Sequence, residues 1–429
     1  MKSARFLAAG LAAALALAAC GSESGDDTEP AAGEGQGTPE PAEIRLWING
    51  ADTPQVMRDW LVTEFEEANP GSTLTIEEQQ WEGLVERLTT SLASESETPD
   101  VVEVGNTQAP TFTNVGAFLD ISDMYEDLGG DDLLPGFVEA GSVDDTLFAV
   151  PYYAGSKYVF YRTDLFEAAG LEVPTTLQEF ADTAVALKQA NADNAAFSGF
   201  WLPGQDWRNG VTWIWDAGGD LAVQEGDEWQ GTLSTPESVA GLEAVQGLFT
   251  DASAAPKDAN EADPQVPFCA GEVGMLSAPG WVRWSIDNAD IGCPEMMENV
   301  GVFALPGSEG EPAPVLLGGS NIAVSANSQN PELAKSLVAL MLSDEYQTMF
   351  AENGLTPAKE SLAPLLGDDE FATAAIEAAS NAKLTPPAEK WAVVEGSRVL
   401  EDLFVAIANG GDVQQLATEA DARITADLN

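Results

Sequence analysis

The chain has 429 residues, with 17 lysines and arginines against 71 aspartates and glutamates and no histidine, so its formal net charge is −54. This length exceeds what one hydrophobic core supports and fits two domains. The negative charge disfavours nucleic acid as a partner, and the missing imidazoles exclude histidine metal ligands and Ser-His-Asp or Cys-His nucleophiles. We expect no cofactor, no metal site and no catalytic residue.

The N-terminus is typical of an export signal, predicted over 1–19. Lys2 and Arg5 form a basic region, and the apolar run Phe6–Ala16 is too short to span a bilayer. Leu-Ala-Ala before Cys20 resembles the lipobox of bacterial lipoproteins. We therefore expect a chain lipidated at Cys20 and anchored on the outer face of the cytoplasmic membrane. A plain secretory signal with a chance cysteine is the alternative.

The segment 20–42 is predicted to be a disordered acidic tether. After the cysteine it has no apolar residue larger than alanine, so it cannot bury enough surface to offset the entropy of ordering. Such a segment suits a folded body that is held close to a membrane.

Strands and helices alternate in the first part of the body, which predicts a parallel sheet with helical crossovers. The predicted elements are a strand over Glu43–Ile48, a helix over Pro54–Ala68, a strand through Leu74 and Ile76, a helix over Trp81–Ser94 and a strand over Val101–Val104. In the first helix Val56, Trp60, Leu61 and Phe65 are expected on one side.

Polar or aromatic residues follow each of these three strands. They are Asn49, Trp81 and Asn106. Ligands of parallel sheets bind beyond the carboxyl ends of the strands, so these residues are candidates for binding.

The stretch Thr146–Gly170 is interpreted as the first of three crossings between two lobes. Pro151 cannot donate to a sheet ladder, so we expect it at the start of a strand or where the chain leaves one sheet. An ordinary strand–loop–strand within one domain is the alternative. The second and third crossings are predicted at Leu316–Val324 and Asp368–Thr385.

Further helices and a buried strand are predicted beyond the first crossing. Their signals are the capping box at Thr176, the Thr235-Pro236 helix start before Glu237–Thr250, the strand Val273–Leu276, the Asn330-Pro331 helix start, and the final helices Trp391–Asn409 and Val413–Leu428.

Cys269 and Cys293 are predicted to form a disulfide, because an exported chain folds in an oxidising compartment. Two unpaired buried thiols are the alternative. The spacing of these cysteines does not fit a zinc site.

In order, the motifs resemble those of the extracellular solute-binding proteins that serve carbohydrate ABC importers, the maltose- and trehalose-binding type. The resemblance rests on the Tyr-Arg-Thr-Asp-Leu-Phe run within Pro151–Gly170, Ala-Gly-x-Val-Gly-Met within Phe268–Trp281, Gly318–Val324 followed by Asn-Pro-Glu-Leu-Ala, and Pro386-Pro387 before Trp391. It covers the chain from about Glu43 onward.

The resemblance implies an α/β, two-lobed periplasmic-binding-protein fold, each lobe a mostly parallel sheet flanked by helices. The expected lobes are 43–150 with 317–368, and 151–316 with 369–429. A carbohydrate ligand, the permease subunits of the importer and a monomeric chain are also implied. The lobes are expected to close on one sugar without chemistry.

The resemblance places binding positions in both lobes and in the crossings. Together with the strand-end residues and the tryptophans in loops, the candidates are Asn49, Asp52, Trp81, Asn106, Tyr153, Trp207, Trp215, Asp216, Trp281, Gly318, Gly319, Ser320, Trp391 and Arg398. Family members often carry an acid at the position of Gly155 and an aromatic at that of Ser320, so these two departures leave the sugar open.

The chemistry of a sugar explains these residue types. Aromatic faces cover the C–H faces of a pyranose, while amides, carboxylates and arginine pair with its hydroxyls. Trp281 is the candidate stacking platform, and Trp47 and Trp60 are assigned to the core because they lie in regular elements.

Two alternatives remain open. Clustered aromatics with nearby acids also suit a quaternary ammonium such as betaine or choline. A lipid-anchored glycosidase or lyase needs two carboxylates at a defined separation, and no pair stands out in so acidic a chain.

Overall fold

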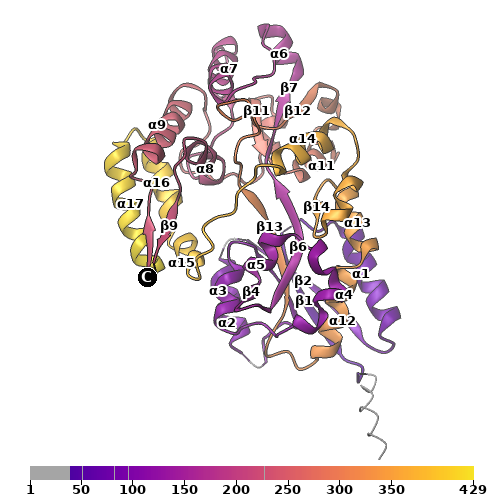
Figure 1. Cartoon of the computed structure of the whole chain (residues 1–429). Coiled ribbons are helices and arrows are strands. Elements are labelled where there is room, and N and C mark those ends of the chain that lie inside the picture. Colours follow the sequence, from indigo (N-terminus) through magenta and orange to yellow (C-terminus); the bar gives the residue numbers. More distant parts are fainter. Residues whose placement is uncertain (1–38, 51, 82, 95, 227) are drawn as a thin grey trace, which may run out of the picture. The chain divides into compact units, whose positions relative to one another are not determined.

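The computed structural model describes residues 39–50, 52–81, 83–94, 96–226 and 228–429. The chain divides into a leading unit, 1–39, and a body, 40–429. The predicted signal peptide and Cys20 lie outside the described residues. The body has two large sheets, each with its own helices, which we call the first and the second lobe (Figure 1). This confirms the predicted two-lobed α/β fold.

The first lobe is built on a six-stranded sheet with the order β14-β6-β13-β3-β1-β2. The strands are β1 (Glu43–Asn49), β2 (Thr73–Gln79), β3 (Val101–Gly105), β6 (Ala149–Ser156), β13 (Leu317–Val324) and β14 (Thr356–Pro357). β1 pairs in parallel with β2 and β3, whereas β13 runs antiparallel to β3 and β6. Ser320 lies opposite both Gly105 and Tyr153, so the carboxyl ends of β1, β3 and β6 share one edge with the start of β13.

Helices cover both faces of this sheet. They are α1 (Gln55–Ala68), α2 (Leu84–Leu92), α3 (Ala109–Asn114), α4 (Tyr125–Leu128), α5 (Pro135–Ala140), α12 (Pro331–Met341) and α13 (Asp344–Glu352), and the hairpin β4 (Ser142–Val143) with β5 (Thr146–Leu147) lies beside them. Adjacent strand residues enter different cores: Leu46 packs with α1, and Trp47 packs with α2. Sheets with side chains buried on both faces need such double coverage.

One detail of α1 differs from the prediction. Met57, Leu61 and Phe65 are buried at a spacing of four, while Val56 is 60% exposed. Residues four apart lie on the same face of a helix, so Met57, Leu61 and Phe65 form the buried face. Val56, the neighbour of Met57, lies outside that face. Trp60 is only partly buried, with its ring 5.4 Å from that of Tyr346.

The second lobe is built on a four-stranded sheet with the order β12-β7-β11-β8. The strands are β7 (Tyr158–Arg162), β8 (Ser198–Phe200), β11 (Val273–Ala278) and β12 (Val300–Phe303). Only β8 and β11 pair in parallel, since β7 runs antiparallel to both β11 and β12. This sheet is therefore mixed rather than mostly parallel as predicted, and so is that of the first lobe, where β13 pairs antiparallel with β3 and β6 and β14 pairs antiparallel with β6.

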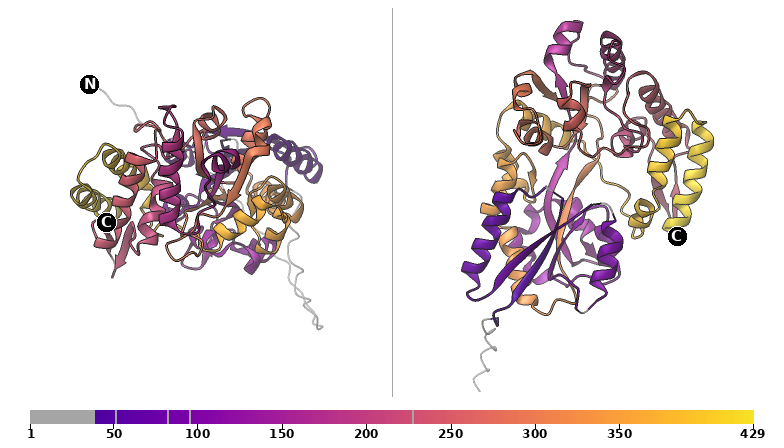
Figure 2. Two further views of the ribbon diagram at one scale, coloured as in Figure 1. Left: turned by 90° about the horizontal axis from the view of Figure 1, so that it is seen from above. Right: turned by 180° about the vertical axis from the view of Figure 1, so that it is seen from behind.

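Helices from three parts of the chain surround the second sheet. They are α6 (Thr163–Ala169), α7 (Leu177–Ala190), α8 (Trp207–Asp216), α9 (Pro236–Asp251), α10 (Gln265–Cys269), α11 (Trp281–Asp287), α14 (Glu370–Ala379), α15 (Trp391–Gly396), α16 (Val399–Ala408) and α17 (Val413–Leu428). A small hairpin of β9 (Ala222–Glu225) and β10 (Glu228–Gly231) packs on α17. The views from above and behind show α16 and α17 side by side in this lobe (Figure 2).

The chain passes from the first sheet to the second at Lys157, between β6 and β7. Pro151 lies inside β6, not at the start of a strand or at the change of sheet as predicted. The ladder tolerates it because the register between β6 and β13 shifts at Ser320 and Asn321, and because β14 pairs only with Tyr153 and Ala154.

Two further passages join the lobes. The chain returns to the first lobe between β12 and β13. It leaves the first lobe again after the 3₁₀ turn Glu360–Leu366, which packs on α13, and enters the second lobe at α14, which packs on β12.

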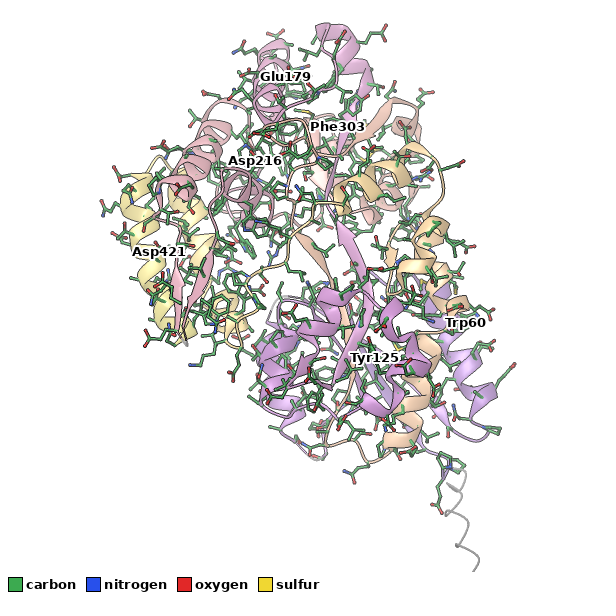
Figure 3. All side chains as sticks on the ribbon, in the orientation of Figure 1. Trp60, Tyr125, Glu179, Asp216, Phe303 and Asp421 are labelled. Carbon is green, nitrogen blue, oxygen red and sulfur yellow. A yellow bond between two sulfur atoms is a disulfide. The ribbon has the colours of Figure 1, made fainter. Side chains whose placement is uncertain are left out.

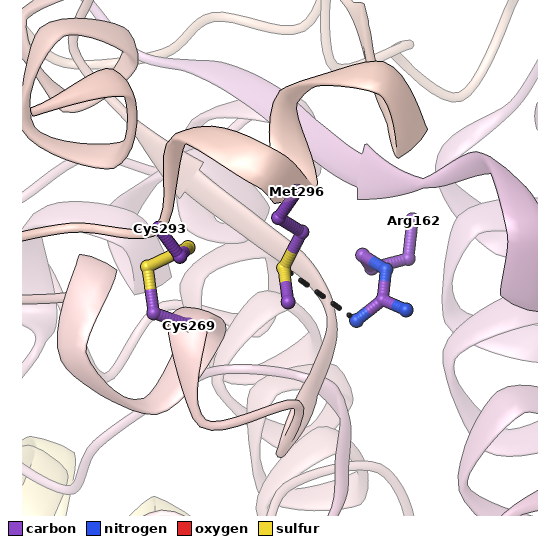
Figure 4. The surroundings of a disulfide bond; sticks show 4 residues. All are labelled: Arg162, Cys269, Cys293 and Met296. Atoms are coloured by element: carbon purple, nitrogen blue, oxygen red, sulfur yellow. Dashed lines mark hydrogen bonds between the residues drawn. A yellow bond between two sulfur atoms is a disulfide. The ribbon is translucent and has the colours of Figure 1, made fainter. Parts of the chain in front are cut away.

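A disulfide joins Cys269 at the end of α10 to Cys293 (Figure 4). Near it, Nη1 of Arg162 lies 3.6 Å from the sulfur of Met296. Within the described residues, no helix has the length and apolarity needed to cross a membrane.

Candidate functional site

Two sheet edges face each other across Lys157, because this one residue joins the end of β6 to the start of β7. The first edge comprises Asn49, Asp52, Trp81, Glu103, Asn106, Tyr153 and Ser320. The second edge comprises Trp201, Gln205, Asp206, Trp207 and Trp281, which follow β8 and β11. Trp281 at the start of α11 packs against the cores of both lobes, so it lies at the junction between them.

The carboxylate of Asp52 is held by two aromatic side chains on the first edge. Trp81 donates its indole N–H to Oδ2 of Asp52 at 3.0 Å, and the hydroxyl of Tyr153 lies 2.9 Å from the same oxygen. Burial raises the pKa of Asp52, although these two hydrogen bonds oppose the shift. Trp81 is 36% exposed, so part of its ring remains open to a ligand.

Glu103 lies beneath this group and is completely buried. Its carboxyl oxygens contact the main-chain N–H of Asn49 at 2.7 Å, the hydroxyl of Ser320 at 2.5 Å and that of Tyr153 at 3.2 Å. Burial raises the pKa of Glu103 to about 8. One carboxyl group therefore connects β1, β3, β6 and β13.

The amides of the first edge support its backbone. Asn49 donates its side-chain amide to the carbonyl of Glu103 at 3.0 Å, and Asn106 donates to the carbonyl of Leu317 at 3.3 Å. Gly319 has a φ of 142°, and a Cβ there would lie 2.3 Å from the carbonyl oxygen of Tyr153. Glycine is thus required where β13 passes closest to β6.

Charged side chains lie at the second edge and at the crossing. Asp206 caps α8 by accepting from Asn209, and Nζ of Lys157 lies 3.6 Å from its Oδ1. Burial raises the pKa of Asp206, and the charge of Lys157 opposes the shift. Arg208 pairs with Glu261 at 2.9 Å and lies 4.8 Å from the ring centre of Trp207.

Some buried polar atoms near the two edges lack a hydrogen-bond partner within the described part of the chain. They are Oδ1 of Asn49, Oε1 of Gln108 and the indole nitrogen of Trp201. A buried donor or acceptor without a partner costs about 1–3 kcal/mol. Each of these three atoms is also shielded from solvent, so a ligand reaches it only if the surrounding side chains move.

Two hydrogen bonds connect helix α3 of the first lobe to the region of α15 in the second. Gln108 donates to Oε2 of Glu395 at 3.3 Å, and Thr111 donates to the carbonyl of Glu389 at 3.1 Å. Trp391 donates its indole N–H to Oε1 of Glu395, so this glutamate has partners in both lobes.

The structure brings together the candidates of the first edge and Trp281, but it places others differently. Trp207 and Trp391 are only 1% exposed, so protein covers both faces of each ring. Trp215 and Asp216 end α8, roughly 12 and 14 Å along the helix from Trp207.

The partners of these outlying candidates are local. Asp216 accepts from Ser308 and Trp215 donates to Asp220, and Figure 3 shows Asp216 within the second lobe. Arg398 donates to Gln205 at 2.7 Å, next to the second edge, and Gly318 pairs with Gly155 in the ladder of β13 and β6.

Sequence reasoning missed Glu103, Gln108, Lys157 and Trp201. A signal existed for Glu103, because it is the one charged residue of the strand Val101–Gly105, whose five residues are all buried. Nothing in the sequence distinguished Gln108 or Lys157 from exposed polar residues.

A hollow lies in the first lobe, among residues that belong to neither edge. It encloses about 650 Å³ and is lined by Ser122, Tyr125, Asp131, Leu133, Pro135, Val138, Glu139, Ser142, Asp144, Asp145 and Leu147. Within the described residues, no group of three or more acidic or cysteine side chains is arranged to hold a metal ion.

Comparison with known families decides the class of this protein. Residues 50–348 match the model of the bacterial extracellular solute-binding proteins. The chain belongs to this family.

The relatives of this solute-binding protein agree with that assignment. The chain is 32% identical over 401 residues to the diacetylchitobiose binding protein DasA of Streptomyces coelicolor, covering 92% of this chain and 91% of that protein. It is 29% identical over half its length to a probable ABC transporter-binding protein of Deinococcus radiodurans, covering 51% of that protein.

Solved structures show the same fold. The GacH receptor of Streptomyces glaucescens, determined unliganded and with acarbose, matches with a TM-score of 0.77 and 21% identity over 91% of this chain and 99% of its own. A substrate-binding protein of Listeria monocytogenes in complex with cycloalternan matches with a TM-score of 0.76 and 22% identity over 90% and 98%.

Proposed function

We propose that this solute-binding protein captures a short, uncharged oligosaccharide between its two lobes and delivers it to the membrane subunits of an ABC importer. The observation that carries the proposal is the position of Trp281, which follows β11 at the second edge and packs against the cores of both lobes. An indole in that position offers its face to a sugar ring, while amides and hydroxyls on either side can pair with the rim.

The first ligand to test is N,N′-diacetylchitobiose. The protein named for binding it is 32% identical to this chain over 92% of its length. Trp81, which is 36% exposed, and the carboxylate of Asp52 beside it also suit a sugar, whose C–H face can stack on the indole and whose hydroxyls or amide N–H can donate to the carboxylate.

Asp52, Trp81 and Tyr153 are proposed to bind from the first lobe and Trp281 from the second, while the buried Ser320 holds Glu103 in place. Asn49 and Asn106 shape the first edge, and Gln205 with Arg398 borders the second. We keep the predicted lobes, 43–150 with 317–368 and 151–316 with 369–429, with the refinement that β6 belongs to the first sheet. The lobes act by closing on the ligand, without catalysis.

The lipid anchor remains part of the proposal. A chain lipidated at Cys20 would present the body to the importer at the membrane surface. Metabolic labelling with a palmitate analogue should mark the wild-type chain and leave a Cys20→Ala variant unlabelled. Labelling of both chains, or of neither, would contradict the anchor.

Isothermal titration of the purified body with a ligand panel tests the function. The panel holds N,N′-diacetylchitobiose, maltose, trehalose, N-acetylglucosamine and, for the cation-binding alternative, betaine. We expect one sugar site per chain, and the sugar recovered afterwards should be chemically unchanged. Binding of betaine alone, or cleavage of the disaccharide, would overturn the proposal.

A further inference from the structure

The hydroxyl of Tyr153 lies between two carboxyl groups. Its oxygen is 2.9 Å from Oδ2 of Asp52 and 3.2 Å from Oε1 of Glu103, and both are hydrogen-bonding distances. A phenol has one hydrogen and can donate to only one of them. If both carboxyl groups were ionised, the other contact would place two oxygens together with no hydrogen between them.

The surrounding groups do not remove this conflict. The hydroxyl of Ser320 lies 2.5 Å from Oε1 of Glu103, and the main chain of Asn49 donates to Oε2. Within the described residues, the contacts to the Glu103 carboxyl come from neutral groups. A buried carboxylate without a cationic partner costs several kcal/mol, so the group takes up a proton instead.

The titratable and charged neighbours are few. Asp52 adds a negative charge, and Tyr152 and Tyr346 lie nearby with their hydroxyls 2.8 Å apart. Among the described residues, Arg58 is the cation whose charge acts on this group. Its nitrogens are engaged by Glu78 and by the carbonyls of Thr53 and Gly50, so it contributes only a distant field.

We propose that Asp52, Tyr153 and Glu103 form a hydrogen-bonded chain that holds one proton besides that of the phenol at neutral pH, and that sugar binding at the first edge requires this proton. Glu103 is a positioning residue in this scheme, since it acts through Tyr153 and Asp52. With the proton present, Glu103 and Tyr153 each carry a hydrogen that they can donate. Each of the two close oxygen–oxygen contacts, from Tyr153 to Glu103 and from Tyr153 to Asp52, then contains a hydrogen.

Loss of the proton to solvent changes the face that meets the ligand. Tyr153 can then donate its hydrogen bond to only one of the two carboxylates, and a second negative charge appears beneath the polar edge. An uncharged sugar does not compensate for that charge, so its affinity should fall. The raised pKa of Glu103, about 8, agrees with a proton held at neutral pH and lost in mildly alkaline solution.

The proton can be detected without any ligand. Infrared difference spectra of the unliganded wild-type protein in D₂O, recorded as pH rises from about 6 to about 10, should lose the carbonyl stretch of a buried protonated carboxyl with a midpoint near 8. The band should be absent from Glu103→Gln and unchanged in the control Glu77→Gln, whose carboxylate pairs with Arg45. A wild-type spectrum without the band at pH 7 would overturn the proposal.

The coupling to the ligand rests on the proposed function and needs a second measurement. The Kd for N,N′-diacetylchitobiose should rise by up to about tenfold per pH unit above 8 in the wild type. It should be flat with pH in Glu103→Gln, whose amide keeps the shape of the neutral acid. The same rise in both proteins would refute the coupling. If no sugar of the panel binds at any pH, the proposed function and the coupling fail, while the infrared result still decides whether the proton is there.

Discussion

Gln108, immediately before α3, and Glu395 on α15 are joined by a hydrogen bond of 3.3 Å, although the two helices belong to different lobes. The other oxygen of Glu395 accepts from the indole of Trp391. The pair therefore links the two lobes, and we expect a change in the angle between them to alter it.

Gln108→Ala should weaken the binding of N,N′-diacetylchitobiose by between about twofold and tenfold, because one hydrogen bond that holds the lobes together contributes roughly 0.5–1.5 kcal/mol. The loss should appear mainly in the dissociation rate, measured by stopped-flow fluorescence. The control is Gln55→Ala, which removes the exposed bond from Gln55 to Asp59 within α1. An unchanged dissociation rate in Gln108→Ala would show that the link plays no part in holding the ligand.

Trp281→Ala should remove the proposed stacking surface and weaken sugar binding by about thirtyfold, equivalent to about 2 kcal/mol for a central aromatic contact. Trp284→Ala is a matched control, since Trp284 lies on the same helix and is 44% exposed. Its affinity should stay within about twofold of the wild type.

Because Trp281 also packs against both cores, thermal unfolding of each variant must be measured and titrations run well below both transitions. Equal loss of affinity in the two variants would argue against a specific role for Trp281.

Removing the disulfide by the double substitution Cys269→Ala and Cys293→Ala should lower the free energy of unfolding. The two cysteines are 24 residues apart in the sequence, and the chain-entropy model gives about 3.4 kcal/mol for a loop of that size. Urea denaturation with and without reductant measures the difference. Reductant should destabilise the wild type and leave the double variant unaffected; a wild type insensitive to reductant after full denaturation would contradict the bond.

Glu103 should make the protein less stable as pH rises. Its pKa is about 8 in the folded chain against an ordinary value of 4.5, so between these values the folded state binds more protons than the unfolded state. The stabilisation is complete below about 4.5 and is lost as pH passes through about 8. Urea denaturation across this range should show a steeper decline for the wild type than for Glu103→Gln, and parallel pH profiles would contradict the assignment.

Local patterns in the sequence predicted the fold, but they did not predict the buried residues of the site. The strand–helix alternation and the cap at Thr176, whose side chain accepts from the N–H of Glu179, predicted elements that the structure contains. Strand ends pointed to Asn49, Trp81 and Asn106, because the carboxyl ends of parallel strands share an edge.

Tertiary contacts fixed the rest. From the sequence, Trp207 and Trp391 were predicted to lie in a loop or at a helix start and to bind the ligand, yet the packing of the protein covers both rings. Pro151 sits inside a strand because a register shift in a distant partner, at Ser320 and Asn321, accommodates it. The bond between Gln108 and Glu395 joins residues 287 positions apart, and no local pattern encodes such a contact.

Hydrogen–deuterium exchange with and without N,N′-diacetylchitobiose tests the central claim most directly. If the sugar lies between the lobes, protection should appear on both edges at once, in peptides that contain Asn49–Thr53, Glu103–Gln108 and Tyr153–Lys157 from the first lobe and Trp201–Trp207 and Ala278–Trp281 from the second. Protection confined to one lobe, or centred on the separate hollow lined by Ser122, Tyr125 and Leu147, would contradict the account.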